Sequence, residues 1–327
     1  MTSKKCFAAI GADFGKTLFT VVEDAILAVY QQFFPAVQYC QPSFIGSRTM
    51  DLQLQNKVAI VTGGSKGIGL GIVQSLIAEG VKVANVNRSE AEGKALEAEY
   101  AKEGCECLFI QGDLTDTEAC RIAVEKTLAR FGRIDILVNN AGVNDGAGLN
   151  AGPAAFVESL KRNLIHYYAM AHYALDALKS SQGCIINIGS KVCETGQGGT
   201  SGYAASKGGI NGLTREWAVE LAGDGVRVNA VLPAETWTPL YEKCLAAMPD
   251  PEAARHEIEQ LIPLGQRFTT IEEMADMVVF LASPRSSHTT GQIMFVDGGY
   301  THLDRKCTAL SNVTKFGAAA ECKTGTK

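Results

Sequence analysis

Short apolar runs alternate with longer amphipathic stretches along most of the chain. The runs are rich in β-branched residues and fall at Val58–Thr62, Val81–Asn87, Cys107–Gln111, Ile134–Asn139, Cys184–Ile188, Arg227–Leu232 and Ile293–Val296. Some, such as Val58–Val61 and Ile136–Val138, are continuously apolar, as strands buried on both faces of a sheet are. Strands that alternate with helices form parallel βαβ units. The pattern predicts an α/β fold with a doubly wound parallel sheet of about seven strands, whose ligand-binding loops lie at the carboxyl ends of the strands.

Two segments flank this regular pattern and differ from it in composition. Residues 1–49 contain apolar side chains at the spacing of one amphipathic helix, at Leu18, Val22, Ile26, Val29 and Phe33. Glu23 and Asp24 lie among them, whereas a targeting or membrane-surface helix is usually basic on its polar face. We therefore expect residues 1–49 to be a packing appendage or non-native upstream sequence. Residues 50–305 are expected to form a single catalytic domain, and residues 306–327 a flexible tail.

Composition narrows the class of protein. With 327 residues, 46% of them hydrophobic, the chain can bury a large core. The formal net charge of −5 argues against a nucleic-acid partner, because such binding depends on basic surfaces. No apolar run is long enough to predict a membrane helix. The ten cysteines come without a secretory signal, so we expect reduced thiols and a cytoplasmic protein. Cys105 and Cys107 lack the further ligands of a zinc site, so no metal is predicted.

The turn after the first strand carries the first chemical signal. It opens a helix that we expect to run to about Gly80. Its glycines allow a tight turn and let a pyrophosphate lie on the free amides at the helix N-terminus. The residues predicted to contact a cofactor here are Gly63, Ser65, Lys66, Gly67, Ile68 and Gly69. An ordinary strand-to-helix turn is the alternative, but the position within a βαβ unit favours a Rossmann-type dinucleotide site.

The end of the second strand bears on which dinucleotide binds. An acidic residue there would hydrogen-bond the ribose diol of NAD, yet this strand ends in Asn87 followed by Arg88. Arg88 and Lys66 would form charge-assisted bonds to a 2′-phosphate. The sequence therefore predicts NADP as the preferred cofactor, with NAD possible. The alternative is that both cations are solvated surface residues.

Two further strand ends supply candidate cofactor contacts. Asp113, with Leu114 after it, would accept a hydrogen bond from the adenine amino group, or Asp113 would cap the next helix. After the fourth strand, the small residues of Asn140, Ala141 and Gly142 would let a cofactor pass close to the backbone. An ordinary turn is the alternative for these three residues.

Ser190, Tyr203 and Lys207 form the strongest signal. Tyr203 and Lys207 are four residues apart and lie on one helical face, so the ammonium would lower the pKa of the phenol. Ser190 closes the fifth strand, where its hydroxyl would point into the ligand crevice. Such a phenol can take a proton from a substrate hydroxyl while a hydride leaves the same carbon. A tyrosine and lysine at this spacing are common on helices, and it is their combination with the glycine turn and Ser190 that predicts catalysis.

In these motifs, in their order and spacing, residues 50–305 resemble the short-chain dehydrogenase/reductase family. The resemblance implies that Tyr203 is the acid/base, that Lys207 lowers its pKa and holds the ribose, and that Ser190 orients the substrate oxygen. It also implies that Asn163 holds a water that relays protons from Lys207. Further implied cofactor contacts follow the sixth strand, at Pro233, Thr236 and Thr238. Ala234 departs from the glycine of the family's turn at this point.

The segments that vary within that family resemble those of bacterial L-fucose dehydrogenases. The resemblance rests on runs such as Arg162–Tyr168, Thr195–Gly198 and Gly298–Arg305. It implies oxidation of L-fucose or a related aldose at the anomeric carbon to the lactone. The substrate-binding candidates in loops beyond the strand ends are the hydrophilic residues Asn144, Glu194, Gln197, Glu235 and Tyr241, together with Trp237, which would supply an apolar face for a sugar ring. Polar groups there favour a polyol, because a steroid or acyl chain would leave them unpaired.

Other functions and assemblies stay open on the sequence. The enzymatic alternative is a 3-oxoacyl or hydroxysteroid reductase, and the non-enzymatic one is an inactive NADP-binding scaffold. The stretches Phe156–Ala171 and Tyr203–Leu221 are apolar over more than one helical face. Helices of this kind need a second buried surface, which predicts a homodimer through them. The family resemblance implies a homotetramer.

Overall fold

A computed structural model describes residues 50–303. The chain divides into two units, Met1–Asp51 and Leu52–Lys327, and all of the described helices and strands belong to the second. The helix predicted within residues 1–49 and the tail predicted for residues 306–327 lie outside the described residues.

The described residues form one parallel sheet of seven strands. In chain order these strands are β1 Val58–Thr62, β2 Lys82–Asn87, β3 Cys107–Gln111, β4 Ile136–Asn139, β5 Cys184–Ile188, β6 Arg227–Pro233 and β7 Ile293–Val296. The order across the sheet is β3-β2-β1-β4-β5-β6-β7, which confirms the predicted doubly wound α/β fold. β2 begins one residue later than predicted because the Val81 amide still bonds the Leu76 carbonyl of the preceding helix, at 3.0 Å.

Nine α-helices connect the strands within the described residues. They are α2 Gly67–Ala78, α3 Glu90–Lys102, α4 Thr117–Phe131, α5 Gly152–Leu160, α6 His166–Ser181, α7 Ser201–Glu220, α8 Pro239–Ala246, α9 Pro251–Gln260 and α10 Ile271–Ala282. A π-helical turn, η2 Lys161–Ile165, joins α5 to α6, and a short 3₁₀ turn, η3 Lys191–Cys193, follows β5.

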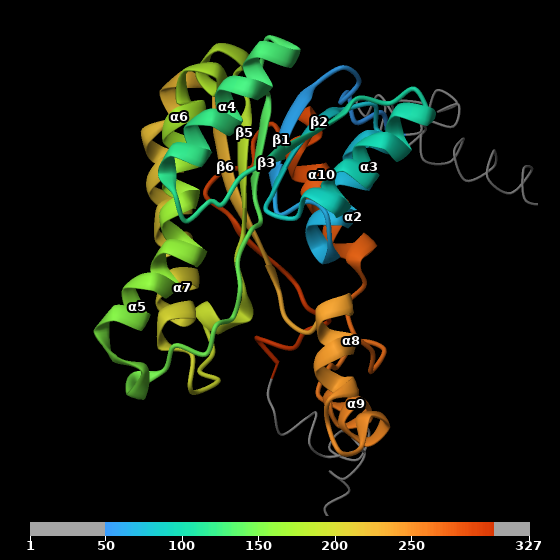
Figure 1. Cartoon of the computed structure of the whole chain (residues 1–327), viewed down its shortest axis with the longest axis vertical. Coiled ribbons are helices and arrows are strands. Elements are labelled where there is room, and N and C mark those ends of the chain that lie inside the picture. Colours follow the sequence, from blue (N-terminus) through green and yellow to red (C-terminus); the bar gives the residue numbers. More distant parts are fainter. Residues whose placement is uncertain (1–49, 304–327) are drawn as a thin grey trace, which may run out of the picture. The chain divides into compact units, whose positions relative to one another are not determined.

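The sheet is covered on both faces, which produces two hydrophobic cores (Figure 1). On one face α2, α3 and α10 pack against the strands through buried residues such as Ile72, Leu96 and Val278. On the other, α4, α6 and α7 contribute residues such as Val124, Met170 and Trp217. Burial on both faces explains the continuously apolar strands, because no strand residue in the centre of the sheet has a solvent-facing side.

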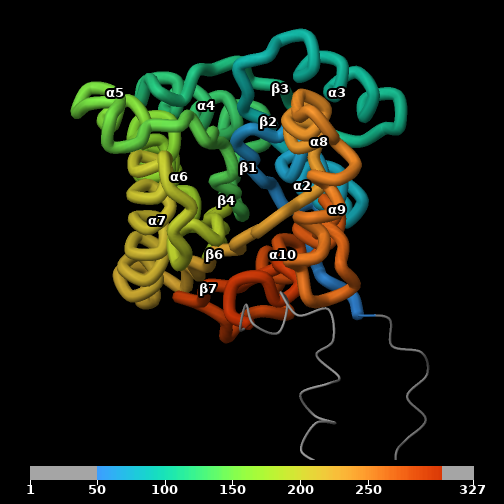
Figure 2. Tube along the Cα trace, turned by 90° about the horizontal axis from the view of Figure 1, so that it is seen from below, coloured from blue at the N-terminus to red at the C-terminus, as the bar shows by residue number. Residues whose placement is uncertain are grey.

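The strand order reverses between β1 and β4, and this reversal positions the ligand-binding loops. Up to β3 the chain adds strands on one side of β1, and from β4 it adds them on the other. Loops that leave the carboxyl ends of β1 and β4 therefore diverge and open a crevice. Seen from below, α8 and α9 lie on one side of these strand ends, and α5, α6 and α7 lie on the other (Figure 2).

Candidate active site

The turn after β1 has a conformation that requires glycine. Gly63 and Gly67 have positive φ values of 68° and 54°. A Cβ on Gly69 would lie 2.2 Å from the Gly63 carbonyl oxygen, so even alanine does not fit there. The first turn of α2 can therefore approach the end of β1 closely, with its backbone amides free for a ligand.

Asn140 and Ala141 fix the loop after β4 against this turn. The Asn140 side-chain amide donates to the carbonyl oxygens of Thr62 and Gly63, at 2.9 and 3.2 Å. The backbone amides of Asn140 and Ala141 both donate to the Thr62 hydroxyl, at 2.9 and 3.1 Å. These bonds hold together the two loops that flank the crevice. Ser65 also has an internal partner, because its buried hydroxyl accepts from the Asn85 side chain at 2.8 Å.

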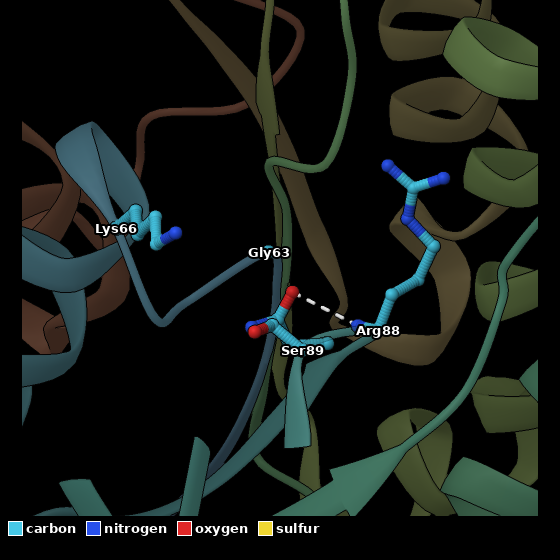
Figure 3. A pocket seen from close by; sticks show the side chains of 5 residues that line it. Gly63, Lys66, Arg88 and Ser89 are labelled. Carbon is cyan, nitrogen blue, oxygen red and sulfur yellow. Dashed lines mark hydrogen bonds between the residues drawn. The ribbon is translucent and has the colours of Figure 1, made fainter. Parts of the chain in front are cut away.

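A cavity of about 440 Å³ opens beside the glycine turn and is lined by Gly63, Lys66, Asn87, Arg88 and Ser89 (Figure 3). Lys66 and Arg88 lie on opposite sides of Gly63. Arg88 is exposed, and its backbone amide bonds the Asn87 side chain at 2.9 Å. Lys66 forms an ion pair with Glu92 in the first turn of α3. Lys66, one of the two cations predicted to bind a phosphate, thus has a carboxylate beside it. No pattern in the sequence predicted this pairing.

The residues after β3 show which aspartate caps the next helix. The N-cap of α4 is Asp116, whose carboxylate accepts from the Glu118 amide at 2.9 Å. Asp113 instead accepts from the amide and hydroxyl of Thr115, at 3.0 and 2.8 Å. The alternative that Asp113 caps the helix was therefore wrong, because a turn of three residues separates it from α4. Asp113 is exposed and Leu114 is buried, and the adenine contact stays a prediction for both.

The segment after β6 completes the surroundings of the glycine turn. Pro233, the last residue of β6, is buried. The Thr238 hydroxyl caps α8 by accepting from the Tyr241 amide at 3.2 Å, and its methyl group lies 3.6 Å from where a Cβ on Gly67 would stand. The Thr236 hydroxyl is buried and has no hydrogen-bond partner within the described residues. A buried orphan hydroxyl beside a glycine turn with free amides fits a dinucleotide that supplies the missing partner.

Ser190 and Tyr203 come together at the end of β5. Ser190 is 8% exposed, caps η3 and accepts from the Val192 amide at 3.4 Å. Tyr203 lies in the first turn of α7. Burial raises the pKa of the Tyr203 phenol, and a hydrogen bond with Ser190 opposes that rise. The serine thus stabilises the phenolate over the phenol, as a general base requires.

Lys207 is buried one helical turn beyond Tyr203. Its Nζ atom donates to the Ile188 carbonyl oxygen at 2.8 Å and to the Tyr167 hydroxyl at 3.3 Å, and lies 5.6 Å from the centre of the Tyr203 ring. Burial lowers the pKa of Lys207 to about 7. The spacing argument placed Lys207 beside Tyr203, but Tyr167, which hydrogen-bonds it, did not stand out in the sequence.

Asn163 lies in the π-helical turn η2, where widened turns often mark functional sites. Its side-chain amide donates to the Ser159 carbonyl oxygen at 3.0 Å, and its side-chain oxygen accepts from the Val143 amide at 2.7 Å. The side chain therefore ties the loop after β4 to the helix. That Asn163 holds a water, as the family resemblance implies, stays a prediction.

The substrate candidates lie in different surroundings. Glu235 and Tyr241 come together, because the Tyr241 hydroxyl donates to Glu235 at 2.6 Å. Glu235 also forms an ion pair with Lys191, the residue after Ser190, and the Lys191 ammonium lies 4.0 Å from the centre of the Tyr300 ring. This charged cluster, Lys191, Glu235, Tyr241 and Tyr300, extends the predicted pair. Its signal in the sequence was the position of Lys191 beside Ser190.

Trp237 packs within α8, α9 and the loop before α10. The Phe268 ring meets it edge-on at 5.2 Å, and the Arg255 guanidinium lies 4.3 Å from its centre. In these contacts Trp237 holds α9 in place, and a sugar-stacking role stays a prediction. Glu194 accepts from the Asn211 side chain at 3.3 Å. The other candidates, Asn144 and Gln197, are exposed.

A glycine turn at the switch point of a doubly wound sheet, with a serine, tyrosine and lysine at the end of β5, defines a nicotinamide-dependent oxidoreductase site. The chain belongs to the short-chain dehydrogenase/reductase family, as predicted, and is an oxidoreductase. The family model described as "Enoyl-(Acyl carrier protein) reductase" matches residues 63–301.

Individual relatives within this family are similar to the chain over most of its length. The L-fucose dehydrogenase of Mus musculus is 40% identical over 245 residues, which are 74% of this chain and 88% of the mouse protein. This relative is mammalian, whereas the resemblance noted in the sequence was to bacterial enzymes. A dehydrogenase of known crystal structure is 47% identical with a TM-score of 0.74, over 78% of this chain and 98% of that one. The ligand-free aldohexose dehydrogenase of Thermoplasma acidophilum is 30% identical with a TM-score of 0.70, over 77% and 96% of the two chains.

Two features of the described residues bear on other kinds of site. Among them, no helix combines the length and the apolar character needed to cross a bilayer. Residues 50–303 also contain no group of three or more histidine, cysteine or acidic side chains that could hold a metal ion.

Proposed function

We propose that this protein oxidises a hydroxyl of a sugar, with L-fucose or a related aldose as substrate and the lactone as product. The observation that carries the proposal is the charged cluster beside Ser190. Two carboxylate oxygens, an ammonium and a phenol hydroxyl gather there, partly buried, one residue from the predicted substrate-orienting serine. These groups can exchange their bonds with one another for bonds to substrate hydroxyls, which a steroid or acyl chain does not offer. The names of the mouse and Thermoplasma relatives support the same substrate class.

The chain's own residues perform the proton transfer. Ser190 hydrogen-bonds the substrate oxygen, and the Tyr203 phenolate takes the proton of the substrate hydroxyl. In its protonated form, Lys207 favours that phenolate by the charge of its ammonium. A bound nicotinamide dinucleotide supplies the acceptor for the hydride that leaves the same carbon. The carbon thus loses a hydride and its oxygen loses a proton, and a cyclic aldose becomes a lactone.

The residues that would hold the dinucleotide surround the glycine turn. The free amides at the start of α2, from Gly67 to Gly69, would bind the pyrophosphate, and Thr236 and Thr238 would meet the nicotinamide end. We further propose NADP as the preferred cofactor, because Arg88 is exposed in the cavity and forms no direct ion pair within residues 50–303, although its charge acts on the Asp113 carboxylate. Lys66 contributes less, because Glu92 neutralises it.

Initial rates test this function. The protein is assayed with NADP and NAD against a panel of aldoses, steroid alcohols and 3-hydroxyacyl thioesters. We expect saturable reduction of the dinucleotide with L-fucose or related aldoses and a higher kcat/KM with NADP. The Tyr203→Phe variant should lose at least about a hundredfold in kcat and still bind the reduced dinucleotide, which its fluorescence reports. Activity confined to steroids or acyl thioesters would overturn the sugar proposal, and unchanged turnover in Tyr203→Phe would overturn the mechanism.

A further inference from the structure

Tyr167 is a buried tyrosine that the chemistry described so far does not use. It lies in the first turn of α6, four residues after Asn163, and its side chain is 0% exposed. Its hydroxyl donates to the Ile188 carbonyl oxygen at 2.9 Å. Because a phenol has one proton, this bond leaves only the lone pairs of the hydroxyl for other partners. Burial also raises the pKa of Tyr167 well above its usual value, so the hydroxyl stays protonated.

The partner of those lone pairs is Lys207. Its Nζ atom lies 3.3 Å from the Tyr167 hydroxyl and 2.8 Å from the Ile188 carbonyl, so the lysine, the tyrosine and the carbonyl form a closed triangle. The Nζ atom also lies 5.3 Å from the centre of the Tyr167 ring, close to the 5.6 Å that separates it from the Tyr203 ring. Lys207 thus sits between two tyrosines, one predicted to react and one with no assigned role.

The position of Tyr167 is itself fixed. The Asn139 side chain, at the end of β4, donates to the Tyr167 carbonyl oxygen at 3.5 Å and to the Asn187 side chain of β5 at 3.1 Å. Asn187 in turn donates to Thr214 of α7 at 3.0 Å. A chain of side-chain bonds therefore connects α6 with β4, β5 and α7, the helix that carries Tyr203 and Lys207.

We propose that Tyr167 is a positioning residue, whose hydroxyl accepts a hydrogen bond from Lys207 and holds its ammonium beside Tyr203. The inference rests on the proposed acid–base role of Tyr203. An ammonium that is buried needs acceptors to remain charged. Ile188 and Tyr167 supply the two that the described residues provide. Without the Tyr167 hydroxyl as an acceptor, the charged form of Lys207 is less stable relative to the neutral amine. The Tyr203 phenolate that this charge stabilises is then less stable as well.

Other groups near Lys207 set the baseline for a pH measurement. Cys193, from η3, acts electrostatically on both Lys207 and Tyr203. His166, next to Tyr167 on α6, is buried, and its low pKa of about 4 keeps it neutral above that pH. Neither residue is changed in the variants below, so a shift between those variants reports the Tyr167 hydroxyl.

The test compares Tyr167→Phe with the matched variant Tyr168→Phe. Each removes one hydroxyl, but Tyr168 is 56% exposed and its ring stacks on His172. The readout is kcat/KM for alcohol oxidation against pH, with any alcohol that the wild-type protein turns over. For Tyr167→Phe we expect the acidic limb to move up by about half to one pH unit, with a threefold to roughly tenfold loss at pH 7. Tyr168→Phe should follow the wild-type profile.

A second variant keeps the fold and the hydroxyl. Site-specific 3-fluorotyrosine at position 167 makes the oxygen a weaker acceptor, so we expect a smaller shift in the same direction. Thermal unfolding of each variant separates a packing defect, which lowers Tm without moving the pH limb. If both changes at position 167 leave the limb where it is in wild type, Tyr167 does not act through Lys207. A wild-type protein that oxidises no alcohol overturns the proposed function, and this inference with it.

Discussion

Lys66 illustrates how one neighbour changes the chemistry of a residue. The sequence places it in the glycine turn, where a cation would attract a 2′-phosphate, but the folded chain brings Glu92 of α3 against it. The carboxylate is 38% exposed, and its second oxygen is buried without a hydrogen-bond partner among the described residues. Phosphate and Glu92 would therefore compete for the same ammonium. No local pattern reveals this pairing, because the two residues lie on different βα units.

Glu92→Gln should therefore increase the preference for NADP. Removing the carboxylate frees Lys66 and removes a repulsive charge from the cavity. We expect the ratio of kcat/KM with NADP to that with NAD to rise about twofold to fivefold. Glu90→Gln is the matched control, since Glu90 lies in the same helical turn but pairs with Lys94. A ratio that is equal in the two variants would show that Glu92 does not limit binding of the phosphate.

Lys207 should make stability depend on pH in the cofactor-free protein. Burial lowers its pKa from 10.5 to about 7, so between these values the unfolded chain binds more protons than the folded one. The free energy of unfolding then rises with pH across this window. Lys207→Met lacks this pH-dependent contribution to the free energy of unfolding, and Tyr167 can still donate to the Ile188 carbonyl in that variant. Relative to wild type, the variant should be most stable near pH 6 and lose at least about 1 kcal/mol of that advantage by pH 10.

Urea denaturation at several pH values measures this difference. Lys94→Met serves as the control, because Lys94 is a surface lysine whose pKa is raised by its hydrogen bond to Glu90. Parallel pH curves for wild type and Lys207→Met would contradict the assigned burial of the charge.

At the scale of elements, the strands were predictable and the turns between them less so. β1, β3, β5 and β7 begin and end at the predicted residues, because each is a mostly apolar run bounded by polar residues or glycine. The π-helical turn η2 has no such signature in the sequence, and its Asn163 bonds Ser159 and Val143, which only the fold brings close. The residues of the candidate active site also differ in how far the sequence predicts them. Motif residues could be found in the sequence, whereas Tyr167, Lys191 and Glu92 act through contacts that only the fold creates.

The glycine turn yields a prediction at this scale. Gly69→Ala would drive its methyl group into the Gly63 carbonyl, 2.2 Å away, and force the start of α2 away from β1. We expect weaker binding of the dinucleotide by at least about tenfold and a lower Tm. Gly223→Ala is the control, because nothing lies within 4 Å of its added methyl group. Fluorescence titration with the reduced dinucleotide measures the binding, and equal affinity in both variants would contradict the tight turn.

At the scale of the molecule, exposed apolar side chains gather on α5, η2, α6 and α7. They are Phe156, Val157, Ile165, Tyr168 and Val219, between 36% and 80% exposed. This surface agrees with the predicted dimer through the same helices, because helices that are apolar beyond their core-facing side favour a second buried surface. The dimer, and the tetramer implied by the family, stay predictions.

Tyr168→Glu tests that assembly. A charge among these exposed apolar side chains should shift the protein toward the monomer at micromolar concentration, which light scattering measures. Leu240→Glu is the matched control, since Leu240 is 66% exposed but lies on α8. Equal masses for both variants and wild type would argue against an interface at α6, and a monomeric wild-type protein would argue against any assembly.

The charged cluster beside Ser190 has a consequence for how tightly a substrate can bind. Both oxygens of Glu235 already have partners, the ammonium of Lys191 and the hydroxyl of Tyr241. An incoming hydroxyl must exchange with one of them, so its net gain is the difference between two similar hydrogen bonds. Tyr241 belongs to α8, so displacing its hydroxyl would also free that helix from Glu235. We therefore expect the cluster to add little to the affinity for a substrate hydroxyl.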